Sequence, residues 1–187
     1  MSSTLQNLTS WTAEKAKRFI KAKKHFDFMC ELYREQIQQG RWVLHEHPAS
    51  ATSWNHKAVV EIFQMEGMHS VLADQCRFGL STKGPDGRQH PAKKRTRFMS
   101  NAPEILVELN QLCRGNHYHQ PLVSGRAGPA ARYPEGLYRA ICRGLIRQIE
   151  RQRQHVRHLL TVEAIDLIDE LPGEEEDYKV IHTTSLE

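Results

Sequence analysis

The sequence contains no run of about 18 apolar residues, and its N-terminus carries lysines but no apolar signal region. Nothing in it therefore predicts membrane insertion or secretion, and no membrane partner is expected. The four cysteines, Cys30, Cys76, Cys113 and Cys142, are scattered without close pairing. This distribution is typical of reduced thiols, so we expect an intracellular protein, in the nucleus or the cytoplasm.

The motifs of several enzyme classes are also missing. Neither glycine-rich phosphate loop occurs, whether G-x-G-x-x-G or G-x-x-x-x-G-K-[ST], and there is no G-x-S-x-G nucleophile elbow. The spacings C-x-x-C and H-E-x-x-H, which mark many metal sites, are absent as well. The chain therefore carries none of the short signatures by which these classes are recognised.

Positive charge is abundant, and it is unevenly distributed. Residues 1–160 contain 25 Lys and Arg against 13 Asp and Glu, a net charge of +12, whereas residues 161–187 contain one lysine and nine acids, a net charge of −8. A basic body followed by an acidic tail indicates a polyanion partner, and nucleic acid before others. A solvated surface beside a disordered tail is the alternative. The predicted organisation is one α/β domain over 1–160 and an acidic, disordered tail over 161–187.

The order of the predicted elements is that of an α/β protein. Helices are predicted at about 12–39, 53–65, 101–113 and 133–160. Strands are predicted at 41–46, 70–76 and 95–100, in one sheet with the first two parallel. Asn101 and Glu104 have the spacing of a capping box at the start of the third helix. Residues 80–94 and 116–132 have the composition of loops.

The stretch before Pro48 is the predicted centre of any functional site. Proline should end the first strand, which places Glu46 at or just past its carboxyl end, where open α/β sheets bind ligands. Because strand side chains alternate, His45 and His47 should share one face and Glu46 should point to the other. The Glu46 carboxylate could accept hydrogen bonds from an amidine-like edge such as that of cytosine. A solvated turn acid is the alternative.

Basic residues form two further groups of candidates. Arg95 and Arg97 would share one face of the third strand, and paired guanidiniums suit phosphate or carboxylate. The alternative is an edge strand protected from aggregation by its charge. The candidate phosphate-binding lysines are Lys21, Lys23, Lys24, Lys93 and Lys94. For the three lysines of the first helix, the alternative is a solvated helix face.

The last set consists of histidines and cysteines. Two His-x-His pairs and two thiols could form a tetrahedral zinc site, although loop histidines are more often hydrogen-bonded or exposed to solvent. The full set is His45, His47, Cys76, Cys113, His117 and His119. The candidate metal residues within it are His45, His47, Cys113, His117 and His119.

A series of motifs over roughly residues 4 to 150 resembles a domain of retroelement-type polyproteins. The motifs are, in order, L-Y-R-E-Q…G-R-W-V-L-H-E-H-P…S-W, D-Q-C-R-F-G, K-K-R-T-R-F-M-S-N, H-Y-H-Q-P-L and Y-P-E-G-L-Y-R-A-I. That domain in turn is similar to the C-terminal half of DNA cytosine methyltransferases. The resemblance implies a partial Rossmann-like, methyltransferase-like three-layer sheet with flanking helices, truncated at the N-terminus.

The resemblance also assigns roles to residues. Glu46 matches the glutamate of the Glu-Asn-Val motif, which in that family binds the flipped target cytosine. Arg95 and Arg97 lie where the Gln-x-Arg-x-Arg motif would place its arginines, and residues 114–132 occupy the place of the target-recognition region. The sequence departs from the pattern at His47 and Pro48, which replace Asn-Val. It also has Lys93 where the Gln-x-Arg-x-Arg motif has its glutamine. None of the four cysteines follows a proline, so the family's Pro-Cys nucleophile is absent.

The predicted function is that of a nucleic-acid-contacting fragment of a retroelement-derived, cytosine-methyltransferase-like domain. We expect no catalysis from this chain alone, and S-adenosylmethionine would bind only if a missing N-terminal half were supplied. The expected partners are nucleic acid and either that missing half or a second copy of the chain. The alternatives are a small zinc-dependent nucleic-acid-binding or nuclease domain, and a degenerate open reading frame with no molecular function.

Overall fold

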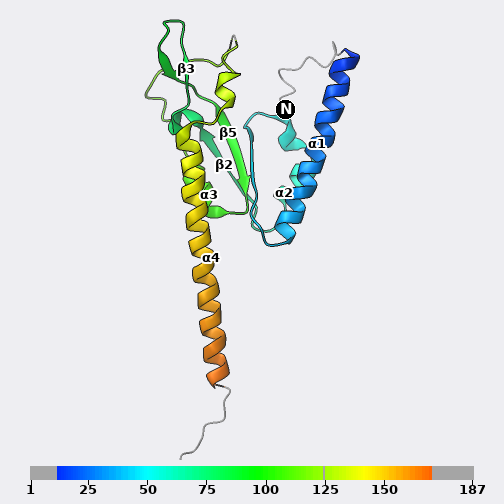
Figure 1. The fold of residues 1–187 in the computed structure, drawn as a ribbon, viewed down its shortest axis with the longest axis vertical. Helices are drawn as coiled ribbons and strands as arrows, with labels where there is room; N and C mark the ends of the chain where they lie inside the picture. The colour runs from blue at the N-terminus through cyan, green and yellow to red at the C-terminus, as the bar shows by residue number, and fades with distance from the viewer. Residues whose placement is uncertain (1–11, 124, 170–187) are drawn as a thin grey trace, which may run out of the picture. The chain divides into compact units, whose positions relative to one another are not determined.

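The computed structural model describes residues 12–123 and 125–169, and within these ranges it shows a mixed α/β fold with four α-helices (Figure 1). The chain divides into two units, Met1–Ile149 and Glu150–Glu187, each of which is described by itself. No helix within the described ranges combines the length and the apolar character that a membrane span requires.

The first helix, α1 (Ala13–Gln38), begins and ends where the sequence predicts. The Thr12 side chain accepts a hydrogen bond from the backbone N–H three residues on, as an N-cap does. At the other end Gly40 has a φ of +68°, and the Arg41 N–H donates to the Gln36 carbonyl at 2.8 Å. These are the features of a Schellman motif, and Gly40 supplies its left-handed residue.

The three predicted strands lie in one sheet, in the order β1 (Leu44–Pro48), β5 (Arg95–Ser100), β2 (His69–Asp74). Both outer strands pair antiparallel with β5, so β1 and β2 run parallel to each other, as expected, but do not touch. Rossmann-like sheets are mostly parallel. The described residues thus form a mixed α/β fold with a small antiparallel sheet and do not show the expected Rossmann-like three-layer sheet.

The first strand differs from its prediction in a way that affects Glu46. It starts at Leu44 and includes Pro48, which pairs with Thr96, so Glu46 lies in the middle of the strand. The expectation that Pro48 stops the strand and leaves Glu46 at its end is therefore wrong. Proline is accommodated because β1 is an edge strand. The next residue, Ala49, resumes the pairing by donating its N–H to the Arg95 carbonyl at 3.1 Å.

Each face of the sheet carries its own apolar cluster. Phe98 packs against α3 (Pro103–Leu109) and the start of α4 (Glu135–Asp169), whereas Met99 packs against α1 and α2 (Lys57–Phe63). Since neighbouring residues of a strand point to opposite faces, these clusters lie on opposite sides of the sheet.

Helix boundaries differ from the predictions at two places where backbone groups find other partners. The helix expected at 53–65 consists of a 3₁₀ turn, η3 (Thr52–Asn55), and α2, with His56 extended between them. The predicted capping box is also wrong, because α3 has no side-chain cap and Asn101 bonds elsewhere. Its side chain accepts from the Val43 N–H and donates to the Arg41 carbonyl, which ties the chain before β1 to the end of β5.

The segment expected as a loop at 80–94 contains a short hairpin, β3 (Ser81–Lys83) and β4 (Gln89–Pro91). The segment following Cys113 packs onto it. Gln120 donates its N–H to the Pro91 carbonyl at 2.8 Å, and the Arg126 guanidinium donates to the Lys83 carbonyl at 3.1 Å. A small apolar cluster joins the two segments and consists of Leu80, Ala92, Leu122 and Ala130.

Helix α4 begins directly after Tyr133 and Pro134, as predicted, but continues to Asp169 rather than ending near Leu160. Its residues 151–162, which belong to the second unit, are all exposed. The greater part of the predicted acidic tail, residues 170–187, lies outside the described residues.

Candidate functional site

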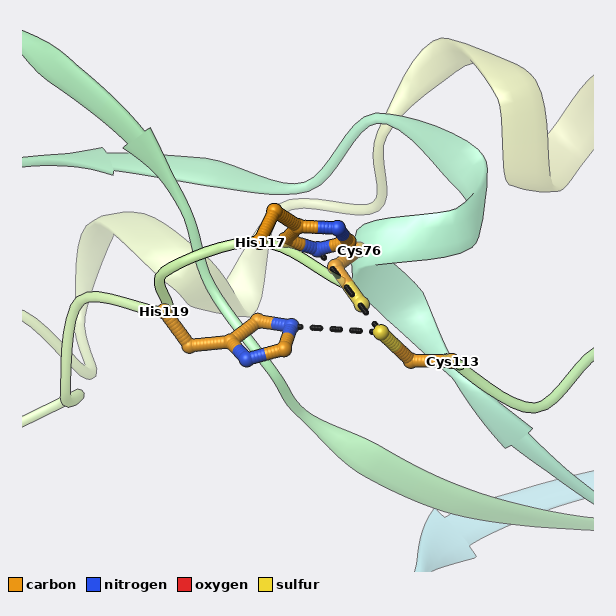
Figure 2. A group of neighbouring side chains, drawn as sticks. All are labelled: Cys76, Cys113, His117 and His119. Atoms are coloured by element: carbon orange, nitrogen blue, oxygen red, sulfur yellow. Dashed lines mark hydrogen bonds between the residues drawn. The ribbon is translucent and has the colours of Figure 1, made fainter. Parts of the chain in front are cut away.

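Four histidine and cysteine side chains come together beside the end of β2. Cys76 lies on η4 (Gln75–Phe78), the 3₁₀ turn that follows β2, and Cys113, His117 and His119 lie on the loop after α3. Their ligand atoms are all within 4.8 Å of one another. Cys113 Sγ is 3.7 Å from His117 Nε2 and 3.4 Å from His119 Nε2 (Figure 2). Two thiols and two imidazoles are a donor set that suits zinc.

Asp74 brings these two segments together through both its backbone and its side chain. The Asp74 N–H donates to the Gln111 carbonyl at 3.0 Å, and the Cys113 N–H donates to Asp74 Oδ2 at 3.0 Å. Helix α3 ends at Leu109, four residues before the predicted end, and this shorter helix leaves residues 110–113 extended enough to reach β2. Because Asp74 immediately precedes η4, holding Cys113 at Asp74 also holds it near Cys76.

The Asp74 carboxylate is fully buried and shared by several donors. Arg95 donates to both of its oxygens, at 2.9 and 3.0 Å, and Lys93 Nζ lies 3.8 Å from Oδ2. Burial favours a higher pKa for Asp74, but the hydrogen bonds from Arg95 and from the Cys113 N–H outweigh it, and the pKa lies below its usual value. Asp74 therefore joins the loop of Cys113 to strand β5 as an ionised carboxylate.

Burial also changes the protonation of the clustered ligands. It raises the pKa of the Cys76 thiol to about 11, with a hydrogen bond to Cys113 as the next cause. The pKa of His119 is lowered by desolvation first, and then by His117 and by Lys93. Without a cation, the Cys76 thiol is thus protonated at neutral pH and the neutral form of His119 is favoured.

The other His-x-His pair, His45 and His47, lies apart from this group. The two rings stack with centroids 5.8 Å apart, and Phe26 and Trp54 meet both of them edge-on. His45 is buried, its Nδ1 is 3.3 Å from the hydroxyl of Tyr33, and desolvation followed by the charge of His47 lowers its pKa to about 4. Of the six histidines and cysteines that the sequence singles out, the structure brings four together and places these two in an aromatic cluster.

Glu46 points to the opposite face from these histidines, as the alternation of strand side chains predicts. The Tyr133 hydroxyl donates to Glu46 Oε2 at 2.8 Å, and burial together with this bond raises the pKa of Tyr133. Lys94 Nζ lies 5.6 Å from the centre of the Tyr133 ring. The second oxygen, Oε1, is buried and has no hydrogen-bond partner among the described residues. Glu46 is therefore a half-satisfied carboxylate rather than a solvated turn acid.

The two candidate arginines are not brought to Glu46. Arg95 is bonded to Asp74, and the Arg97 guanidinium lies 5.2 Å from the centre of the Trp54 ring. Arg97 pairs with His47 across β1 and β5, so it lies on the face away from Glu46.

The candidate lysines fall into two places. Lys93 and Lys94 precede β5 beside Asp74 and Tyr133, next to the groups described above. The other three, Lys21, Lys23 and Lys24, are exposed on α1.

Sequence reasoning did not single out Asp74 or Tyr133 as parts of a site. Asp74 had a usable signal, because an acid at the end of a buried strand and two residues before a cysteine needs a partner inside the protein. Tyr133 had none, since its contact with Glu46 joins residues 87 positions apart. Comparisons with protein-family models, with curated proteins and with solved structures find no match to this chain.

Proposed function

We propose that this chain is a nucleic-acid-contacting fragment of a retroelement-derived, cytosine-methyltransferase-like domain, without catalysis of its own. Two independent features support the proposal. The first is the order of the polyprotein-like motifs along the sequence. The second, which carries it, is a concentration of positive charge around the β3–β4 hairpin and the loop that packs on it.

The basic region is defined by side chains on η4, the hairpin, the chain before β5 and residues 113–133. They are Arg77, Lys83, Arg88, Lys93, Lys94, Arg114, Arg126 and Arg132. Residues 74–103 hold seven Lys and Arg against two acids, Asp74 and Asp86, and residues 110–132 hold three arginines and no acid. Asp74 is buried and pairs with Arg95 and Lys93, so it offsets part of the charge of these two residues. Asp86 is itself engaged by His90, 2.9 Å away. Little local negative charge therefore offsets this positive region, and such a surface attracts phosphate.

A salt titration tests whether this region binds nucleic acid. We expect the log affinity for fluorescently labelled single- and double-stranded DNA and RNA, measured by anisotropy, to fall linearly with log salt, by about 0.7 to 0.9 for each phosphate neutralised. Replacing Lys83, Arg88 and Lys94 together with glutamine should flatten this slope. These three are chosen over Arg95 because Arg95 also bonds the buried Asp74.

The matched control is Lys57→Gln, which removes an exposed lysine from α2, outside the basic region. It should leave the slope almost unchanged. A salt-independent interaction, or an equal loss of slope in the triple variant and in the control, would contradict the proposal.

Glu46 provides a second test, directed at the methyltransferase-like ancestry. The resemblance implies that the Glu46 carboxylate accepts a hydrogen bond from the exocyclic amine of a flipped cytosine, and its Oε1 has no other hydrogen-bond partner among the described residues. Glu46→Gln should weaken binding of cytosine-containing single strands more than binding of strands without cytosine, because the amide presents one acceptor instead of two. The paired affinities measure this. An equal change for both strands would assign Glu46 to structure through Tyr133.

A further inference from the structure

We propose that Cys76, Cys113, His117 and His119 bind one zinc ion, and that this ion is structural. The inference does not rest on nucleic-acid binding, because it follows from the donor atoms alone. The proposed ligands differ from those expected from the sequence, because they include Cys76 and exclude His45 and His47.

The spacing of the ligand atoms fits a tetrahedral ion. With Zn–S of about 2.3 Å and Zn–N of about 2.0–2.1 Å, a tetrahedral site separates its sulfur and nitrogen ligands by roughly 3.5 Å. The two sulfur–nitrogen distances at Cys113 are 3.4 and 3.7 Å, and all four ligand atoms lie within 4.8 Å of one another. Small side-chain shifts would bring all four ligand atoms to these separations around one zinc ion.

The surrounding hydrogen bonds orient these ligands as a metal site needs. The Asn116 side-chain oxygen lies 3.1 Å from His117 Nδ1, so Nδ1–H can donate to it and the Nε2 lone pair is left for the ion. The Gly115 N–H donates to Cys113 Sγ at 3.3 Å, a bond that stabilises a thiolate, and the φ of Gly115, +75°, favours glycine. Asp74 holds the backbone of Cys113 from the other side.

The loop is bonded at its two ends, Cys113 to Asp74 and Gln120 to Pro91, and between them the Tyr118 ring meets the His90 ring edge-on. Residues 114–118 are all exposed, so burial of apolar side chains contributes little to their order. A zinc ion would join this loop to η4 across the 36 residues between Cys76 and Cys113. It would also hold the loop itself at three residues, Cys113, His117 and His119. With four protein ligands, no position remains for a water or a substrate, which is the arrangement of structural rather than catalytic zinc.

Metal content of the purified full chain tests this inference. We expect one zinc per chain by elemental mass spectrometry, after desalting, in the wild type and in the control variants Cys142→Ser and His25→Gln, which change an exposed cysteine and an exposed histidine of α1. Cys113→Ser and His119→Gln should lose the metal. Asn116→Ala should retain it with about 10- to 100-fold weaker affinity, measured by competition with a chelator.

A measurement on the unaltered chain guards against variants that fail to fold. The wild type, stripped with a chelator under reducing conditions, should take up one Co²⁺ with the visible absorption of a tetrahedral thiolate site, and Zn²⁺ should displace it. No metal uptake by the wild type, zinc retained in Cys113→Ser, or an intact mass showing a disulfide in place of the metal would each overturn the inference.

Discussion

Asp74→Asn is expected to lower the free energy of unfolding by about 3 kcal/mol, because it removes the charge that several donors share in a buried place. The carboxylate is fully buried and accepts two bonds from Arg95 and one from the Cys113 N–H. An amide of the same shape can accept at one atom only, and its NH₂ would face a donor. Urea unfolding monitored by circular dichroism measures the change.

The matched control is Asp86→Asn. Asp86 also accepts hydrogen bonds, from the Arg88 N–H and from His90, but its side chain is 48% exposed and water can replace these partners. The midpoint of unfolding should hardly move. Equal destabilisation by the two substitutions would show that the contribution of Asp74 to the free energy of unfolding does not depend on its burial.

Gly144→Ala is expected to destabilise the protein by about 2 kcal/mol, as overpacking of a close contact does. Helix propensity alone predicts the opposite, a gain of about 1 kcal/mol from replacing glycine inside a helix. A Cβ at Gly144 would lie 2.5 Å from the Ile105 Cα and 2.8 Å from the Glu104 carbonyl oxygen. Both contacts are to backbone, which cannot turn aside as a flexible side chain can.

The comparison for this prediction is Cys142→Ala, two residues earlier on the same helix and exposed. It changes helix propensity without touching α3, and it should leave the protein as stable as before or slightly more so. A Gly144→Ala variant more stable than the wild type would mean that α4 does not approach α3 as closely as described.

Local signals in the sequence predicted several elements correctly. Strand β5 was predicted at its observed bounds, because a basic, turn-rich stretch precedes it and Asn101 follows. The ends of α1 were predicted because Thr12 and Gly40 have clear capping chemistry. The hairpin was missed since its strands are three residues long and largely polar, so neither length nor alternation distinguished them from a loop.

Contacts between segments that are far apart in the sequence could not be predicted from local sequence signals. Nothing in the sequence indicates that β5 lies between β1 and β2, because that order depends on which faces the helices cover. The same holds for the metal ligands. His117 and His119 have the same His-x-His pattern as His45 and His47. The two pairs differ in their surroundings, because Cys113 precedes His117 by four residues, whereas aromatic side chains surround His45 and His47.

The metal site and the basic region share the same part of the chain. Arg77 follows Cys76 directly and Arg114 follows Cys113, while Lys93 lies beside Asp74. A structural ion at this position would fix the backbone from which these cations project. This arrangement links the proposed zinc to the proposed binding of nucleic acid, although each can be tested without the other.

X-ray absorption at the zinc edge tests the central claim, the four-ligand centre, most directly. The full chain loaded with one zinc should show two sulfur ligands at about 2.3 Å and two nitrogen ligands at about 2.0–2.1 Å, with the outer-shell scattering of imidazole. In Cys76→Ser, which like Cys113→Ser should lose its zinc on desalting, zinc added back in excess should show at most one sulfur ligand. A zinc surrounded only by oxygen and nitrogen, or one whose two sulfurs persist in Cys76→Ser, would contradict the account.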